Sequence, residues 1–217
     1  MTTLKNQREM LKAQRESRKK KTILMVFAVV GVVALALLLL YFVPRRKADG
    51  PSLGDPEALV KVEQFSNFTC SHCQTFALES EPGFLKDYVD SGKVHLTYFN
   101  YQFQEDDSSK AAEATYCAGE QNKFWEYKKL VYQNASYAGA FADESLRTYA
   151  RNVSLNIDEF ESCLQSDRQV KVITDGRQYA QMLGVNATPT FAVNGKLVYQ
   201  NELREAVDAA LAEASAN

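Results

Sequence analysis

The sequence predicts a mixed α/β domain with an inserted block of helices, preceded by a single N-terminal transmembrane helix. Three features support this prediction: a long uncharged segment near the N-terminus, strand-like segments near both ends of the remaining chain, and helix-like segments between them. The 217 residues suffice for one domain of ordinary size together with an appendage.

Residues 23–43 form a run of 21 residues without a charged side chain, rich in Val, Leu and Ala. A helix of this length crosses the hydrocarbon core of a bilayer. The run is longer than the apolar part of a cleaved signal peptide, and it ends without a small-residue cleavage pattern. We therefore predict an uncleaved signal anchor over residues 22–43, between a basic tail (1–21) and a linker (44–56).

The basic residues on the two sides of this segment predict its orientation. Residues 1–21 contain eight Lys or Arg side chains, whereas the opposite flank contains three, at residues 45–47. The more positive flank of a membrane helix generally remains in the cytoplasm. We expect a single-pass protein of the inner or plasma membrane, with a cytoplasmic N-terminus and an extracytoplasmic domain at residues 57–217.

The chain beyond the anchor is acidic. Residues 48–217 contain 14 basic and 25 acidic side chains. A domain with this excess of negative charge argues against binding to nucleic acid, whose phosphates it would repel. All four cysteines lie in this segment, and their even number suits an oxidising compartment in which disulfides persist.

Strand-like segments rich in β-branched and aromatic residues begin and end this domain. They lie at about 59–66, 94–101, 190–193 and 196–199. Asn194-Gly195 between the last two is typical of a type I′ hairpin turn. A final helix is expected over about 202–214, because its apolar residues recur at helical spacing.

Residues 105–183, between the second and third strands, are predicted to be helical almost throughout. Asn122, Asp143 and Asn156 are suitable residues to start helices, and Gly184 is suitable to end the last one. Strand–helix–strand, a helical block, then a hairpin and a helix is the order of a thioredoxin-type sheet with a helical insertion.

Cys70-Ser71-His72-Cys73 follows the first strand and opens the next helix-like segment. Two cysteines at this spacing can alternate between a dithiol and a disulfide, and the N–H groups of a helix start stabilise a thiolate on the first. We predict that Cys70 attacks and that Cys73 resolves. His72 is predicted to donate to the thiolate and lower its pKa, the alternative being an exposed residue without a role. Ser71 is small enough to donate weakly to sulfur.

A structural disulfide, or half of a zinc site, is the alternative use of this cysteine pair. Zinc requires two further ligands, usually from a second close-spaced Cys/His pair. The sequence has no such pair, because Cys117 and Cys163 are 46 residues apart and the only other histidine is His95. We expect neither a metal ion nor another cofactor.

Thr188-Pro189 stands directly before the third strand, where the missing N–H of a proline does not interrupt a sheet ladder. We predict a cis Thr188–Pro189 bond that presents the Thr188 backbone to a bound substrate chain. A trans proline that ends a loop is the alternative. Phe68, two residues before Cys70, either belongs to the core or lines an apolar groove for unfolded substrates, and we include it among the candidate substrate-binding residues.

Cys117 and Cys163 both lie beside apolar residues in the helical block. In an oxidising compartment a disulfide between them is favoured, and it would close a long loop. Two buried free thiols that behave as small hydrophobic side chains are the alternative.

Together these motifs resemble the DsbA-like thiol–disulfide oxidoreductases of the thioredoxin superfamily. The resemblance covers about residues 57–214 and is carried by segments 63–73, 111–118, 123–127 and 184–195. It implies a thioredoxin fold with an inserted helical domain, an attacking Cys70, a cis Pro189, and donation of disulfides to exported proteins with free thiols. Some members have a second disulfide in the helical domain, which Cys117 and Cys163 would match. The family's oxidases are recharged by a quinone-linked membrane partner of the DsbB or vitamin-K-epoxide-reductase (VKOR) type.

Two positions depart from the pattern of this family. The family usually has an acid six residues before the first cysteine, where this chain has Gln64, and an amide cannot shuttle a proton. Glu63 lies on the opposite face of the strand and is predicted to be solvated. The middle pair Ser71-His72 lacks the proline that is more frequent there, so the redox potential cannot be transferred from the family.

The sequence thus predicts a membrane-tethered extracytoplasmic oxidase. An extracytoplasmic reductase or isomerase is one alternative, and a client-binding thioredoxin-like module without catalysis is another. Metal delivery has little support, because only His72 and His95 could join the thiols as ligands.

Overall fold

The computed structural model describes residues 25, 31, 33, 48–102 and 108–216. Among these residues, no helix combines the length and the apolar character needed to cross a membrane. The predicted transmembrane segment at 22–43 lies almost wholly outside the described residues. The compact unit Lys47–Asn217 contains the domain that is described below.

The described part of the domain contains one five-stranded sheet with the order β1-β3-β2-β4-β5. Its strands are β1 (Ser52–Leu53), β2 (Val60–Ser66), β3 (Val94–Asn100), β4 (Thr190–Val193) and β5 (Lys196–Tyr199). β2 and β3 are parallel, and the other neighbouring pairs are antiparallel. The four strands predicted from the sequence are therefore all present.

The hairpin between β4 and β5 has the predicted turn. Asn194 and Gly195 have φ angles of 46° and 85°. Positive φ at both central residues is the requirement of a type I′ turn, which only Asn, Asp and Gly satisfy readily.

The first strand, β1, was not predicted. Ser52 and Leu53 pair with β3, although the sequence placed them in a linker that ends at residue 56. The prediction of a linker is wrong for these residues, because a strand of two residues has no periodic pattern to detect. The chain before β1 lies very close to β3, and glycine at position 50 permits this, since a Cβ atom there would lie 2.5 Å from the carbonyl oxygen of Tyr98.

After β2 the chain forms one uninterrupted helical run over residues 71–89. It alternates between α and π turns as α2 (Ser71–Thr75), η1 (Phe76–Ser80), α3 (Glu81–Phe84) and η2 (Leu85–Val89). The residues at its internal boundaries all have right-handed helical angles. Pro82 lies at the start of α3, directly after a π turn in which the Glu81 N–H donates to the Phe76 carbonyl.

The predicted helical block consists of five helices among the described residues. They are α4 (Ser109–Gly119), α5 (Phe124–Asn134), α6 (Asp143–Asn152), α7 (Ile157–Gln165) and α8 (Val170–Leu183). Asn156 caps α7 as predicted, since its side chain accepts from the Glu159 N–H, and α8 ends at Gly184 with φ 84°. The cap predicted at Asn122 is wrong: this residue has φ 60° in the preceding turn, and α5 begins at Phe124.

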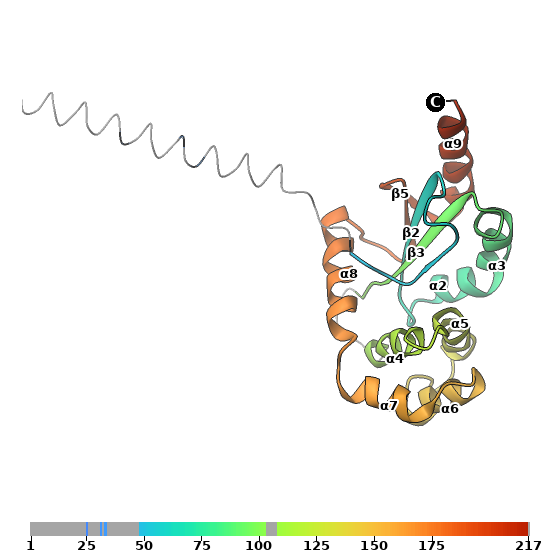
Figure 1. The fold of residues 1–217 in the computed structure, drawn as a ribbon, viewed down its shortest axis with the longest axis vertical. Helices are drawn as coiled ribbons and strands as arrows, with labels where there is room; N and C mark the ends of the chain where they lie inside the picture. Colours follow the sequence, from blue (N-terminus) through green and yellow to red (C-terminus); the bar gives the residue numbers. More distant parts are fainter. Residues whose placement is uncertain (1–24, 26–30, 32, 34–47, 103–107, 217) are drawn as a thin grey trace, which may run out of the picture. The chain divides into compact units, whose positions relative to one another are not determined.

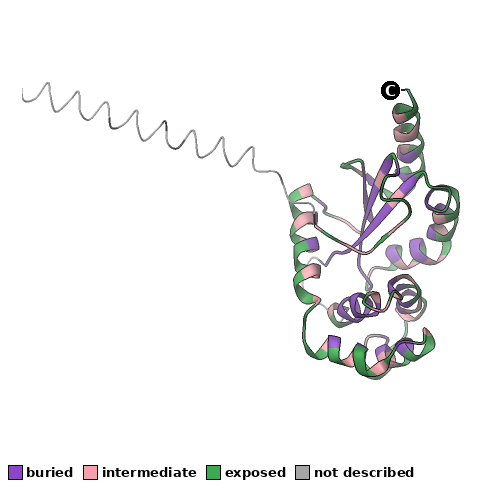
Figure 2. Cartoon of the chain, viewed as in Figure 1, coloured by how far each residue is buried: buried purple, intermediate pink, exposed green. Residues whose placement is uncertain are grey.

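Helices cover both faces of the sheet (Figure 1). One face packs against the helical run 71–89 and the C-terminal helix α9 (Leu203–Ser215), which follows the short 3-10 helix η3 (Gln200–Glu202). The other face packs against α8. Buried residues concentrate in the sheet and on the inner sides of these helices, as Figure 2 shows.

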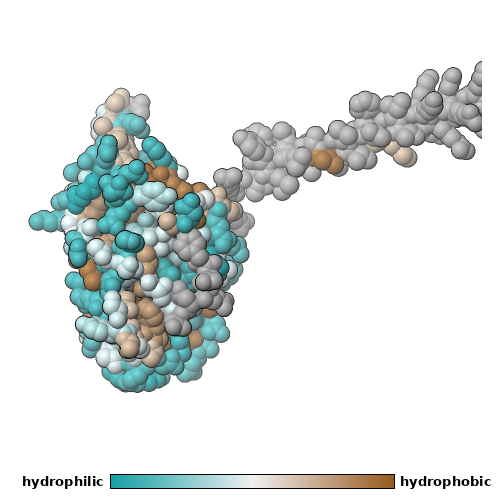
Figure 3. All heavy atoms as spheres, turned by 180° about the vertical axis from the view of Figure 1, so that it is seen from behind, coloured by the Kyte–Doolittle hydropathy of each residue, from teal (hydrophilic) through white to brown (hydrophobic). Residues whose placement is uncertain are grey.

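The helical block has a core of its own beside the N-terminal end of the helical run. Seen from behind, the surface of the domain is mainly hydrophilic with scattered hydrophobic residues (Figure 3). Isolated exposed apolar side chains of this kind are normal on a folded domain.

A disulfide connects the first and fourth helices of this block. Cys117 of α4 and Cys163 of α7 are bonded, with their Cα atoms 5.7 Å apart. Both cysteines are buried in the core of the block. This is the pairing that the sequence favoured over two free thiols.

Removing this disulfide should destabilise the domain without removing the other cysteine pair. The two cysteines are separated by 46 residues, and cross-linking a loop of that size restricts the unfolded chain by about 4 kcal/mol in the chain-entropy model. We expect the Cys117→Ala/Cys163→Ala variant to lose about 2–4 kcal/mol of unfolding free energy in urea titrations. An unchanged unfolding midpoint would contradict this account.

Candidate functional site

Cys70 lies at the start of the helical run that follows β2. It is the N-cap residue of α2, with φ −84° and ψ 116°, and its sulfur accepts from the backbone N–H of Cys73 at 3.4 Å. A cap residue normally satisfies one of the free N–H groups of a first helical turn with a side-chain oxygen. Here a sulfur takes that place, so the helix start binds the thiol directly.

Hydrogen bonds at this position lower the pKa of the Cys70 thiol to about 5. The largest contribution comes from the Cys73 side chain, followed by Thr188 and the backbone N–H groups of Cys73 and His72, while partial burial acts in the opposite direction. Cys70 is therefore a thiolate at neutral pH. His72 contributes through its backbone N–H, whereas the sequence had assigned this effect to its imidazole.

Cys73 differs sharply from Cys70, although the two lie three residues apart. It is 1% exposed and packs within the core of the helical block. Burial, and after it the sulfur of Cys70, raises the pKa of the Cys73 thiol. The two cysteines form no disulfide in this structure, so the pair is a dithiol with one reactive and one protected sulfur.

The loop before β4 faces the partly exposed sulfur of Cys70. The Cys70 sulfur lies 3.2 Å from the carbonyl oxygen of Thr188, 118 residues away in sequence, and donates to that oxygen when it is protonated. The Thr188–Pro189 peptide bond is cis, as predicted. Antiparallel pairing of β4 with β2 holds this loop beside the start of the helix.

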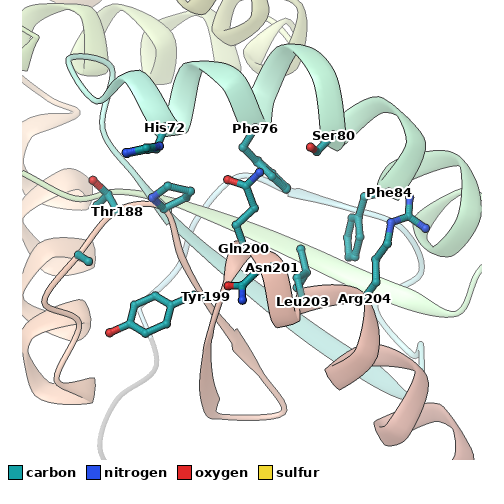
Figure 4. Close-up of a pocket in the computed structure, with 12 residues that line it drawn as sticks. His72, Phe76, Ser80, Phe84, Thr188, Tyr199, Gln200, Asn201, Leu203 and Arg204 are labelled. Atoms are coloured by element: carbon teal, nitrogen blue, oxygen red, sulfur yellow. The ribbon is translucent and has the colours of Figure 1, made fainter.

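A groove of about 450 Å³ runs along the helical run beside these residues. One wall is formed by His72, Phe76, Ser80 and Phe84 of the helical run, as Figure 4 shows. The opposite wall consists of residues before β4 and after it: Ala187, Thr188, Pro189, Tyr199, Gln200, Asn201, Leu203 and Arg204. His72 and Tyr199 are exposed, so the groove opens to solvent near the cysteines.

Two of the residues predicted for the site lie elsewhere or contribute little. Phe68 was predicted as a candidate groove residue, but it is 1% exposed and its ring packs 4.7 Å from that of Tyr132. That prediction is wrong, because the chain turns inward before Cys70 and places Phe68 in the core. Ser71 is exposed on the first turn of α2.

Gln64 and Glu63 lie on opposite faces of β2. Gln64 shares the face of the helical run with Val62, and its Nε2 donates to the Ser66 hydroxyl. Its Oε1 is buried without a hydrogen-bond partner among the described residues. Glu63 was predicted to be solvated, but it is 4% exposed and accepts from the Tyr179 hydroxyl at 2.9 Å, because α8 covers that face.

One charged pair near the cysteines could not be predicted from the sequence. Lys128 of α5 and Glu81 of α3 form an ion pair of 2.6 Å, with side chains that are 1% and 7% exposed. Neither residue stands in a motif, and only the packing of two distant helices brings them together. The described residues contain no cluster of three or more His, Cys, Asp or Glu side chains that could hold a metal ion.

A thioredoxin-like sheet, a helix that begins at a reactive cysteine and a second cysteine beneath it define a thiol–disulfide oxidoreductase. The sequence matches the family described as Thioredoxin over residues 46–213. The chain belongs to this family and is a DsbA-like member of it.

Relatives and solved structures agree with this assignment. The chain is 26% identical over 212 residues to a probable disulfide bond formation protein D of Bacillus anthracis, with 89% of this chain and 97% of that protein covered. Oxidised BdbD of Bacillus subtilis aligns with a TM-score of 0.65 at 21% identity, covering 76% of this chain and 99% of that one. DsbA of Chlamydia trachomatis also gives 0.65, at 24% identity, covering 77% and 94%. At these identities the two solved structures support the fold.

The acidity of Cys70 leads to a pH prediction for the reduced protein. Thiolate absorbance at 240 nm should titrate with a midpoint near pH 5, because the pKa of Cys70 is about 5. The pKa is lower in the folded than in the unfolded chain, where it is about 8.5. The resulting stabilisation is therefore complete above about pH 9 and is lost as the pH falls through 5.

The urea midpoint of the reduced protein should accordingly be lower at pH 5 than at pH 8. The disulfide form, in which Cys70 does not titrate, should show a smaller difference between the two pH values. The Cys70→Ser variant is the control and should lack the absorbance change near pH 5. A thiolate that appears only near pH 8–9 would show that the helix start does not activate Cys70.

Proposed function

We propose that this protein is a membrane-tethered extracytoplasmic oxidase that donates disulfides to exported proteins through Cys70 and Cys73. The observation that carries the proposal is the stabilised thiolate of Cys70 at the helix start. A stable thiolate favours the dithiol over the disulfide, so the disulfide form is a strong oxidant. Donation, rather than reduction, is then the favoured direction of exchange.

The exchange uses the difference between the two sulfurs. A substrate thiolate attacks the sulfur of Cys70, the Cys70–Cys73 bond breaks, and Cys73 leaves with the electron pair as a thiolate. A second substrate thiolate then attacks the substrate sulfur of the mixed disulfide and releases Cys70 as a thiolate. The substrate loses two electrons, and the cysteine pair gains them. Because Cys70 is partly exposed and Cys73 is buried, Cys70 is the sulfur that the substrate attacks in the first step and the sulfur that leaves in the second.

Thr188 and Pro189 are proposed to receive the substrate chain beside Cys70. The Thr188 carbonyl lies at hydrogen-bond distance from the Cys70 sulfur, so a chain bound along this loop has its own sulfur close to the reacting one. The groove between the helical run and the β5–α9 connection continues from there. Its aromatic and polar walls suit an unfolded polypeptide with mixed side chains.

The tether and the location rest on the sequence and on the second disulfide. Residues 22–43 are proposed as the anchor, with the N-terminus in the cytoplasm. The Cys117–Cys163 disulfide is consistent with an oxidising compartment. A quinone-linked membrane protein of the DsbB or VKOR type is proposed to reoxidise the cysteine pair, since donation leaves it reduced.

The redox potential separates the oxidase from a reductase or isomerase. Equilibration of the Cys70/Cys73 pair with glutathione should give a potential above about −200 mV, in the range of oxidising members of this superfamily. The redox potential of the Cys70/Cys73 pair can be measured on a segment that begins near residue 48, where the compact unit begins. A potential below about −250 mV, as for thioredoxin, would contradict the proposed direction.

Trapping separates catalysis from client binding without exchange. In the full-length Cys73→Ala variant the resolving sulfur is absent, so mixed disulfides between Cys70 and exported proteins should accumulate and be visible on non-reducing gels. The Cys70→Ala/Cys73→Ala variant is the control and should give none. A Cys70→Ser protein that retains full activity would favour the binding module instead.

A further inference from the structure

Lys128 and Glu81 form a buried ion pair for which the exchange chemistry described above has no use. Their 2.6 Å contact is closed to solvent at both ends. The Lys128 ammonium also lies 4.9 Å from the ring centre of Tyr98 and 4.6 Å from that of Trp125. Burial of two charges is costly, and apolar side chains of similar volume often stabilise a fold at least as well. Packing alone therefore gives no reason for this pair.

The pair lies in the interface that also buries Cys73. Glu81 belongs to the helical run that begins at Cys70, and Lys128 belongs to α5, which packs against that run. Gln74, the residue after Cys73, donates through its side chain to the carbonyl of Tyr132 at 2.7 Å, and Tyr132 lies one helical turn after Lys128. Tyr132 and Cys73 are members of one apolar cluster. The charge and the buried sulfur thus share a single enclosed region.

We propose that Lys128, held by Glu81, is a positioning residue that stabilises the negative charge released onto the cysteine pair when its disulfide opens. The bond that breaks is the one between the sulfurs of Cys70 and Cys73, and the electron pair goes to Cys73. That sulfur is buried at this moment, so its charge cannot be solvated by water. Lys128 places a buried ammonium in this interface, and its positive charge lowers the energy of the departing thiolate.

The electrostatics of the region are consistent with this role. Burial lowers the pKa of Lys128, and both the Glu81 carboxylate and Cys73 counteract that effect. The interaction is mutual: if charge on Cys73 favours the ammonium, the ammonium favours charge on Cys73. Among the described residues, Tyr98 and Tyr132, whose hydroxyls are hydrogen-bonded to each other, also interact electrostatically with Cys73, and the imidazole of His72 is exposed.

The position of Gln64 fits the same interpretation. The strand residue beneath the helical run is a neutral amide, so no charge reaches the buried sulfur from the sheet through this position. Lys128 and Glu81 approach instead from the helical block. The inference rests on thiol–disulfide exchange itself and holds for exchange in either direction.

Two single substitutions test the proposal, because each of them weakens the positive charge at position 128. Lys128→Met removes the cation, so the pKa of Cys70 should rise and the equilibrium constant for oxidising glutathione should fall about tenfold. A tenfold change corresponds to about 30 mV for this two-electron couple. Glu81→Gln removes the carboxylate that counteracts the effect of burial on the pKa of Lys128, so Lys128 loses positive charge and both quantities should shift in the same direction as in Lys128→Met, by a smaller amount.

The measurements are thiolate absorbance at 240 nm and glutathione equilibration, with urea unfolding to record stability. If Lys128→Met does not fold, the Lys128→Met/Glu81→Leu variant keeps apolar packing and should shift both quantities in the direction expected for Lys128→Met. Arg168→Gln and Glu120→Gln are the matched controls, since that exposed pair joins α4 to the segment before α8. They should leave both quantities unchanged.

Loss of stability in both single variants, with an unchanged pKa and potential, would overturn the proposal and leave the pair as a purely structural contact between α5 and the helical run. A lower pKa of Cys70 and a larger equilibrium constant in Lys128→Met would overturn it as well. The oxidase proposal fails separately, since it depends on the absolute potential of the unmodified protein, whereas this inference depends only on differences between variants.

Discussion

The placement of the Cys70 sulfur at the start of a helix is the constraint on which the rest of the site depends. The sulfur lies at hydrogen-bond distance from the Cys73 N–H and from the Thr188 carbonyl. The first contact is local and follows from the helix beginning directly after β2. The second requires that β4 pair with β2, since only this pairing brings residue 188 to the same edge of the sheet. A short sequence motif thus acquires its chemistry from a sheet that is completed more than a hundred residues later.

The inserted helices make the two cysteines unlike each other. A helix alone gives its first turn a favourable environment for a thiolate, and both sulfurs lie within that turn. The core of the helical block covers Cys73 and leaves Cys70 partly exposed. The same disulfide can therefore be attacked at one sulfur and not at the other. The Cys117–Cys163 disulfide connects two helices of this block, so it stabilises the helices that bury Cys73 and not the reacting cysteine pair itself.

The sequence predicted those features that depend on local patterns. The strands, the Asn194-Gly195 turn and the cap at Asn156 follow from periodicity and from side chains that bond their own backbone. Features that depend on distant partners could not be predicted this way. Glu63 has the alternation of an exposed strand residue, but α8 covers it and supplies the Tyr179 hydroxyl. Likewise, no spacing in the sequence relates Glu81 to Lys128, 47 residues further on.

The interface between α5 and the helical run raises the energy of a negative charge on Cys73, and it also contains the cation that lowers that energy. The packing that removes Cys73 from water also removes Lys128 and Glu81 from water. An ammonium at the surface would be screened and would act weakly over the same distance, whereas one inside this interface acts in a medium of low dielectric constant. Deeper burial of the sulfur raises the energy of its thiolate, and the same burial strengthens its attraction to Lys128. A fold that protects the resolving cysteine by burial therefore benefits from placing a paired cation within that same buried interface.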